Sequence, residues 1–428
     1  MAMRERLRFY SVLGLALLSF LAPLKFSLPV VFYNLQIWPS GLMEWLIAMW
    51  PETLFYAGFA LLFMIGIAAM TPQERRPRWM LLPALFVGVQ LLAALAGIDL
   101  QTSLHVLFLM LSVVLGFWLG GTFLRSEREI RWVLLAWVLA SVFVAWKGIS
   151  DATGGLEETR QYLQMHPEIA TGNPELWHKV QSNRIFSTFV YPNALGGFII
   201  CALWIIAAWM FLPSEGTKEF DMLRRVAAGV IGMALLYCLW KSGSKGSYAS
   251  LVATGMVLLL TRFRRWKGML PSLIVLLLLA MGIFAVGYGR VAVEMGRRTL
   301  EARLDYWQAA LKIGWDHPFL GSGPGAFAKL YPQYKSAAAE STRLTHNLYL
   351  QMWSDSGLIG LLTCIAFFPG ILIQWFRREK SKSALQWCIA CAGVAFAFHS
   401  FMDFDFYMVG NVWPLFVLLG HLRVDDKE

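Results

Sequence analysis

One segment of the chain, residues 289–345, combines many cationic side chains with a histidine that follows it directly. The segment carries eight basic and five acidic residues, a net charge of +3, and His346 stands between Thr345 and Asn347 just before a long apolar run. A histidine at a helix start can accept a proton from a hydroxyl, because imidazole is partly neutral near pH 7. His346 is therefore our candidate general base, with a structural hydrogen-bonding role at a membrane interface as the alternative.

The cations of residues 289–345 suit a phosphate-bearing ligand. They are Arg290, Arg297, Arg298, Arg303, Lys312, Lys329, Lys335 and Arg343. Fixed cations beside a membrane can hold a diphosphate-linked lipid through charge-assisted hydrogen bonds. Arg303 and Trp307 are four residues apart, so on a helix the indole can anchor the surface while the guanidinium projects from it. Solvated surface charge is the alternative for any single residue of the set.

Two further basic residues lie beside apolar runs. Lys245 stands in a short connection between two runs. A lysine on the translocated side of a short connection is disfavoured, which favours a functional role over a lysine that only reaches toward the interface. Arg184 ends a polar stretch just before a run, where it can contact a phosphate or anchor the span.

The sequence Asp403-Phe404-Asp405, close to His399, is the DxD-like element of the chain. Such carboxylates can bind a divalent metal, but here they come late in the chain, and the reactive segment already supplies positive charge through its cations. We therefore predict chemistry without a metal or other cofactor. Asp403 then orients His346 or a basic residue, or caps a helix.

The composition indicates that lipid surrounds most of the chain. Of 428 residues, 57% are hydrophobic and 15% are charged, against roughly 25% charged in soluble domains. Because a helix satisfies its own backbone hydrogen bonds in lipid, apolar runs of about 20 residues are expected, and they are found. We predict an all-α polytopic protein of the bacterial inner membrane. Nucleic-acid binding is excluded, since the positive-inside rule explains the basic connections.

The apolar runs predict about twelve transmembrane helices. They lie near residues 9–25, 52–70, 79–97, 103–124, 131–149, 188–212, 226–241, 246–261, 268–288, 346–375, 384–401 and 407–422. An even number of spans places both termini on one side. Alternate connections, such as 125–131 and 262–267, are rich in arginine and lysine, so that side is predicted to be the cytoplasm.

The long connections then face the periplasm and define the predicted division of the chain. The predicted parts are N-terminal spans over 1–149, a first periplasmic loop over 150–187, spans over 188–288, a catalytic periplasmic loop over 289–345 and final spans over 346–428. Because no cytoplasmic segment is long enough to fold alone, the functional residues are expected on the long loops.

Helical spacing appears inside the catalytic loop. Leu300, Leu304, Trp307 and Leu311 recur at intervals of four, three and four, which predicts an amphipathic helix lying along the membrane surface. His317-Pro318 is expected to end that helix, and the glycines of residues 321–325 to make a tight turn. The N–H groups of this turn could bind a phosphate, or the glycines could be there only because the turn requires their backbone conformation.

These motifs, in this order, resemble the O-antigen ligase and polymerase superfamily. The resemblance rests on Arg303 with Trp307, Pro318 to Phe327, Thr345-His346-Asn347, Asp355 to Gly360, Phe186-Ser187-Thr188-Phe189 with Tyr191-Pro192-Asn193, and Ser242-Gly243-Ser244-Lys245-Gly246. It spans roughly residues 184–405, and the set is far more specific than any one motif.

The resemblance implies a membrane-embedded glycosyltransferase of the C type. Such enzymes pass a glycan from undecaprenyl diphosphate to a hydroxyl, which for the ligases belongs to the lipid A core oligosaccharide. It implies that His346 lies at the reaction centre and that Arg303 engages the donor diphosphate. Lys245 stands where the family usually has arginine, and lysine lacks the bidentate fork of arginine. Further substrate contacts are expected at Arg184, Asn193, Arg343, Asn347, His399 and Asp403.

Several functions share this donor chemistry. An O-antigen ligase is favoured because the chain is compact and has no extra soluble domain for a protein acceptor; a polymerase and a protein O-oligosaccharyltransferase are the nearby alternatives. A flippase or exporter of lipid-linked glycan is the alternative of a different class. Transport predicts charges deep within spans, whereas the candidate residues cluster at one membrane face. His346 itself can act as a base, or bind the acceptor or a phosphate as imidazolium.

Overall fold

The computed structural model describes residues 2–35, 38–75, 77–165, 180–212, 217–262, 289–337, 339–378 and 382–422. Within these ranges every named element is a helix, which confirms the all-α prediction. The long helices are α1 (Ala2–Lys25), α3 (Glu52–Ala69), α4 (Leu81–Ala96), α5 (Leu100–Phe123), α6 (Glu127–Ser150), α10 (Pro192–Met210), α11 (Lys218–Ser242), α12 (Lys245–Arg262), α14 (Gly289–Asp316), α16 (Leu348–Arg377), α17 (Ala384–His399) and α18 (Val409–His421).

Shorter helices connect them. These are α2 (Leu42–Ile47), α7 (Leu156–Met165), α15 (Phe327–Tyr334), the 3-10 turns Val30–Leu35, Arg78–Met80 and Asp405–Tyr407, and the π-helical turn Asp151–Gly155. The π turn joins α6 directly to α7, so the first predicted loop, 150–187, begins as helix.

Eight helices in the described part of the chain are long and apolar enough to cross a membrane. They correspond to the predicted runs from 9–25 to 226–241 and to 346–375, and they confirm a multi-pass membrane protein. The runs 384–401 and 407–422 fold as the shorter apolar helices α17 and α18, and 246–261 coincides with α12. The predicted span 268–288 lies outside the described residues, and the count of twelve is not confirmed.

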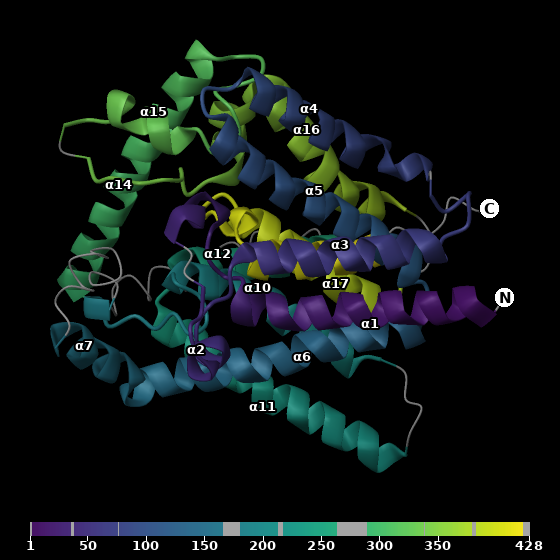
Figure 1. Ribbon diagram of the computed structural model, residues 1–428. Coiled ribbons are helices and arrows are strands. Elements are labelled where there is room, and N and C mark those ends of the chain that lie inside the picture. The colour runs from purple at the N-terminus through teal and green to yellow at the C-terminus, as the bar shows by residue number, and fades with distance from the viewer. Residues whose placement is uncertain are drawn as a thin grey trace.

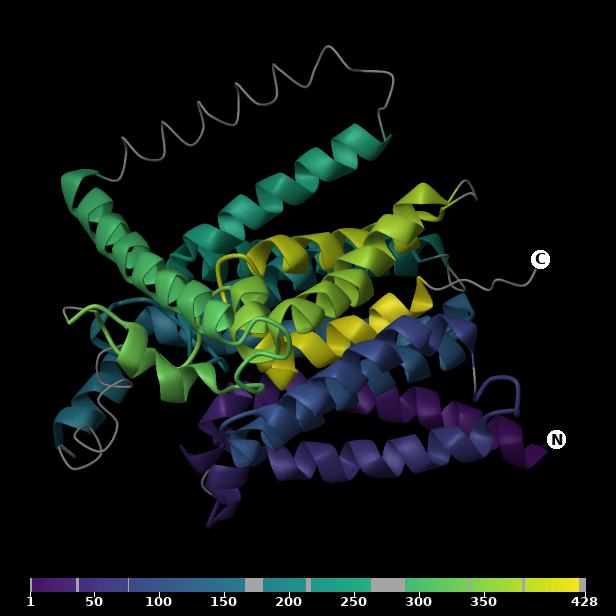
Figure 2. The same ribbon diagram turned by 90° about the horizontal axis from the view of Figure 1, so that it is seen from above.

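The long helices run side by side, whereas α14 crosses them at one end (Figures 1 and 2). We call this the site end; α1, α6, α11 and α17 finish there, and α5, α10, α12, α16 and α18 begin there. Backbone hydrogen bonds join the connections at this end, for example Leu348 N–H to Ser400 O (2.8 Å) and Gly410 N–H to Phe26 O (3.0 Å). At the opposite end Glu74 forms ion pairs with both Arg8 and Arg125, each at 3.0 Å.

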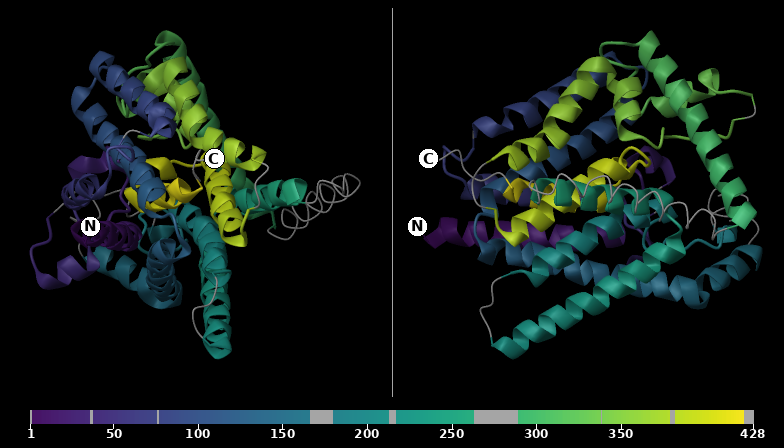
Figure 3. Two further views of the ribbon diagram at one scale, coloured as in Figure 1. Left: turned by 90° about the vertical axis from the view of Figure 1, so that its right-hand side faces the viewer. Right: turned by 180° about the vertical axis from the view of Figure 1, so that it is seen from behind.

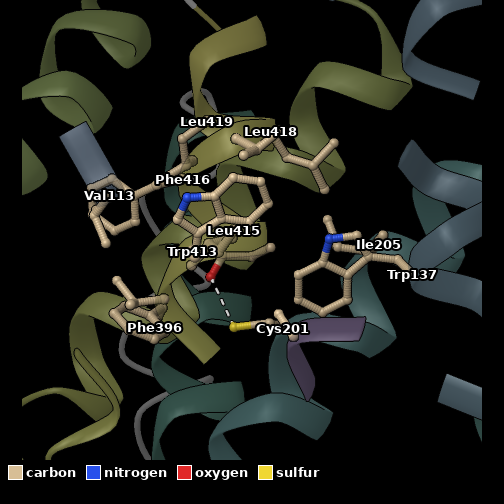
Figure 4. Packing of buried hydrophobic residues seen from close by; sticks show 14 of the residues in the cluster. Val113, Trp137, Cys201, Ile205, Phe396, Trp413, Leu415, Phe416, Leu418 and Leu419 are labelled. Carbon is tan, nitrogen blue, oxygen red and sulfur yellow. Dashed lines mark hydrogen bonds between the residues drawn. The ribbon is translucent and has the colours of Figure 1, made fainter. Parts of the chain in front are cut away.

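The bundle core is built on close contacts between α5 and α18. A Cβ on Gly120 would lie 2.0 Å from the Val417 carbonyl oxygen, so only glycine allows the two backbones to approach this closely. Trp413 lies among the buried side chains of this core (Figure 4). Its indole N–H donates to Ser112 O (3.1 Å). Helix α11, the least buried of the eight candidate spans, leaves the bundle toward its first residues (Figure 3).

Helix α14 packs through one face and exposes another. Tyr306, Ala309, Ala310 and Ile313 form a small core with Phe327 and Tyr331 of α15. On the other side Leu300, Leu304 and Leu311 are 51%, 44% and 43% exposed. These three leucines of the predicted stripe therefore face away from the protein, whereas Trp307, its fourth member, is partly buried and packs against the small core. The helix ends at Asp316, directly before the predicted stop at His317-Pro318.

Candidate active site

His346 is held in an unusual backbone conformation at the start of α16. Its φ of +53° lies in the left-handed region, which costs a residue with a side chain roughly 1–2 kcal/mol. The neighbours fix it there: Thr345 N–H donates to Gln351 Oε1 (2.8 Å), and Asn347 Oδ1 accepts from the N–H groups of Tyr349 (3.0 Å) and Leu350 (3.1 Å). Asn347, an expected substrate contact, thus lies beside His346 and caps the helix that follows.

The imidazole of His346 lies among aromatic rings and one carboxylate. Its ring centroid is 5.8 Å from that of Tyr306 and 4.7 Å from that of Phe404. Burial, with Glu340 adding to it, raises the pKa of Tyr306 to about 12, so this phenol stays protonated at neutral pH. The side chain of His346 is 23% exposed, and its Nδ1 faces Asp403 Oδ1 at 3.5 Å. That separation is an ion-pair distance and is too long for a good hydrogen bond.

Asp403 is a buried anion at the centre of this group. Its side chain is 1% exposed, and its Oδ1 accepts the Phe404 N–H (2.8 Å). Burial acts to raise the pKa of Asp403, but His346, His399 and Arg303 outweigh burial and hold that pKa below its ordinary value. Asp403 is therefore ionised at neutral pH.

Arg184 approaches Asp403 from the segment before α10. Its Nε donates to Ser242 O and its Nη2 to Asn193 Oδ1, both at 2.7 Å. The pKa of Arg184 is lowered, chiefly by burial; Asp403 opposes this change and Arg303 adds to it. The charges of Asp403 and Arg303 therefore both act on this guanidinium. The structure thus brings together Arg184, Asn193, Arg303 and Asp403, which come from three separate parts of the sequence.

Arg303 and the first turn of α12 both approach Met402. Arg303 is partly buried, with Nη1 4.0 Å from Met402 Sδ. A Cβ on Gly246 would lie 3.1 Å from Met402 Cβ, so this glycine lets α12 pack closely. Lys245, the residue before Gly246, opens α12 and is exposed. Arg303 and Gly246, the residue after Lys245, therefore both lie next to Met402, which precedes Asp403 in the chain.

Two of the expected substrate contacts, Arg343 and His399, bind other parts of the protein. The guanidinium of Arg343 lies 4.6 Å from the centre of the Phe32 ring and donates to Val31 O (3.2 Å), so it binds the segment after α1. His399 is 1% exposed, and both ring nitrogens contact protein atoms: Nδ1 lies 2.6 Å from Asp405 Oδ2, and Nε2 lies 3.0 Å from Ser247 Oγ.

The glycine-rich turn uses its N–H groups inside the protein. Gly325 N–H donates to Asp355 Oδ2 (2.7 Å) and Gly323 N–H to Asp355 O (2.8 Å). Gly321, Gly323 and Gly325 all have φ between +67° and +108°, which favours glycine. The glycines therefore allow the chain to turn, and the N–H groups of the turn bind protein atoms and not a phosphate. Asp355, whose role the sequence did not reveal, organises it from α16.

Among the described residues no group of three or more histidine, cysteine, aspartate or glutamate side chains is arranged to hold a metal ion.

The fold and site define a multi-pass helical membrane protein with a partly buried charged centre at one end of its bundle. Residues 228–365 match the model of the family described as O-antigen ligase (Wzy_C), so the chain carries a domain of that family, as the resemblance predicted. Its members are glycan-transferring enzymes, ligases or polymerases. The match contains Lys245, Arg303 and His346, whereas Arg184 and Asp403 lie outside it. No curated protein matches the chain.

Proposed function

We propose that the protein is an O-antigen ligase. It transfers a glycan from undecaprenyl diphosphate to a hydroxyl of the lipid A core oligosaccharide, without a metal, in a C-type glycosyltransferase fold. The observation that carries the proposal is the arrangement around His346: one partly exposed imidazole faces a buried anion, Asp403, while Arg303 and Arg184 lie within electrostatic reach of the same carboxylate.

His346 acts on the acceptor. With Asp403 facing Nδ1, the proton of a neutral imidazole is favoured on that nitrogen, and Nε2 is left as the acceptor. Nε2 takes the proton of the acceptor hydroxyl as the oxygen attacks the anomeric carbon of the donor sugar. The bond from that carbon to the diphosphate oxygen breaks, and its electron pair leaves with undecaprenyl diphosphate. Asp403 stabilises the imidazolium that forms.

Arg303 and Lys245 act on the donor. Negative charge develops on the leaving diphosphate, so cations fixed in advance stabilise the transition state. Arg303 provides a planar fork and Lys245 a point charge. Arg184 supports them through its remaining nitrogen, since Nε and Nη2 already bind Ser242 and Asn193.

The charge distribution supports one orientation in the membrane. Arginines gather at the end opposite the site, where Arg8 and Arg125 meet Glu74. By the positive-inside rule this end faces the cytoplasm of the inner membrane and the site end faces the periplasm, where the glycan lipid and the lipid A core meet. The bundle then contains about twelve spans, as the sequence predicts.

Reconstitution tests the proposal. Purified protein is mixed with undecaprenyl-diphosphate glycan and rough lipopolysaccharide in EDTA, and the lipopolysaccharide is analysed by gel mobility. Transfer in chelator by the wild type, but not by folded His346→Ala or Arg303→Ala, supports the ligase. Lengthening of the donor without modified lipopolysaccharide identifies a polymerase. Binding of the glycan lipid without any transfer indicates a flippase and overturns the proposal.

A further inference from the structure

A buried chain of hydrogen bonds lies directly behind the candidate site. Ser244 Oγ is 2.8 Å from Ser247 Oγ, Ser247 Oγ is 3.0 Å from His399 Nε2, and His399 Nδ1 is 2.6 Å from Asp405 Oδ2. All four residues are at most 1% exposed. We call them the serine–histidine relay. It joins the first turn of α12 to the end of α17 and to the turn Asp405–Tyr407.

Helix α10 makes room for the relay. A Cβ on Gly197 would lie 1.8 Å from Asp405 Oδ2, and a Cβ on Gly196 would lie 2.3 Å from Ser247 Oγ. Both distances are far below a van der Waals contact, so two adjacent helix positions must lack a side chain. A glycine inside a helix costs about 1 kcal/mol relative to alanine. Helix α10 therefore has two destabilising glycines at the positions that face Ser247 and Asp405.

Stability alone does not account for these residues. A buried histidine and carboxylate cost free energy to desolvate, and well-packed apolar side chains of the same volume often stabilise a core equally well or better. A hydrogen-bonded network does, however, fix a unique register between the elements that it joins. The relay joins two of the segments that carry charged candidate residues, the start of α12 with Lys245 and the turn with Asp403.

Each end of the relay lies next to such a residue. Lys245 stands between Ser244 and Ser247 at the start of α12, whereas Asp403 stands between His399 and Asp405. A shift of α12 against α17 would therefore change the distance between the lysine ammonium and the carboxylate that faces His346. Gly246 packs against Met402 Cβ and lies near His399 Nε2, so α12 is in close contact with the end of α17 and the residues that follow it.

We propose that Ser247, His399 and Asp405 are positioning residues that hold Lys245 in place for the donor diphosphate. Asp405 accepts the Nδ1–H of His399, so Nε2 accepts the Ser247 hydroxyl proton and anchors the first turn of α12. The relay acts through Lys245 and does not touch substrate. This inference rests on the proposed function, because it requires Lys245 to bind the donor.

A double-mutant cycle tests the relay. Initial rates of transfer are measured against donor concentration for the wild type, Ser247→Ala, Lys245→Ala and the double variant. Loss of one hydrogen bond predicts a three- to tenfold higher donor KM for Ser247→Ala, with kcat within about twofold of the wild type. In the Lys245→Ala background the same substitution should leave donor KM unchanged, because its target is gone.

Two further variants separate positioning from general loosening of the fold. Ser247→Thr keeps the hydroxyl and should restore most of the donor affinity. Thr254→Val removes another buried hydroxyl, bonded to Ser250 O, about two turns further along α12, and should leave donor KM unchanged. If Ser247→Ala does not fold, Ser244→Ala replaces it at the outer end of the relay, with the same expected direction.

The outcomes distinguish a failure of the relay from a failure of the role proposed for Lys245. Equal increases in donor KM for Ser247→Ala with and without Lys245 overturn the relay while leaving the proposed function intact. A donor KM that Lys245→Ala does not change overturns both the role of Lys245 and the relay. The increase for Ser247→Ala, its loss in the double variant and its rescue by threonine together support the relay.

Discussion

Replacing Asp403 with asparagine tests how the site activates His346. The substitution keeps the size and the Phe404 N–H contact of the side chain but removes its charge. Unit charges about 4 Å apart interact by roughly 4 kcal/mol at an effective dielectric constant near 20. The His346–Asp403 separation is 3.5 Å, and the His346 side chain is 23% exposed, so solvent reduces the benefit to imidazolium to about 1.5–3 kcal/mol.

A loss of this size corresponds to a decrease of about 10- to 150-fold in kcat. Donor KM should stay within about twofold, because Asp403 acts on the acceptor side. Initial rates of transfer to rough lipopolysaccharide at saturating donor provide the measurement. Asp316→Asn is the matched control, since it removes an exposed carboxylate bonded to Tyr334 and should leave kcat unchanged. A kcat within twofold of the wild type for Asp403→Asn would refute the reasoning.

Three further predictions follow from named contacts. Gly197→Ala should destabilise the protein by about 1–3 kcal/mol through its clash with Asp405, measured as a lower melting temperature, whereas Gly229→Ala, which has open space around it, should not. Lys245→Arg should match or lower the donor KM, because arginine binds a diphosphate bidentately; a tenfold higher KM would contradict a phosphate role. Burial acts to raise the pKa of Asp403 but its cationic neighbours lower it overall, so its contribution to stability is present above about pH 4 and is lost as pH falls further. The melting temperature of the wild type should therefore fall more steeply on acidification from pH 5 than that of Asp403→Asn, and parallel curves would contradict this.

Local patterns and the family resemblance together predicted the centre of the candidate site. His346 stands directly before an apolar run and Arg303 falls on a helical stripe, and the resemblance implied a role for each. The structure then supplied the partners. The bond from Arg184 to Asn193 and the contact of His346 with Asp403 join residues 9 and 57 positions apart. No periodicity encodes such pairings.

The relay was missed for a related reason. Serines in an apolar helix usually bond to their own backbone, as Ser250 does with Gly246 O, so Ser247 gave no distinct signal. His399 was expected to contact substrate, and its burial against Ser247 and Asp405 was not foreseen. The available signal was the pair Gly196-Gly197 inside an otherwise bulky apolar run, since adjacent glycines there indicate a close approach by another element.

Hydropathy also predicted the positions of the last two apolar helices better than it predicted their ends. The predicted runs at 384–401 and 407–422 correspond to helices that end at His399 and begin at Val409. Between them the polar turn with Asp403 and Asp405 folds into the protein, where both carboxylates are buried. Burial of this turn shortens the two helices, and a hydropathy window cannot detect it.

The most direct test of the central claim compares His346→Gln with the wild type for both donor binding and transfer. Glutamine keeps a polar side chain of similar reach but cannot take a proton. The account predicts unchanged affinity for undecaprenyl-diphosphate glycan and a fall of at least about 100-fold in kcat, in the range of general base catalysis. A His346→Gln variant that keeps most of its transfer activity would show that His346 binds substrate and is not the base.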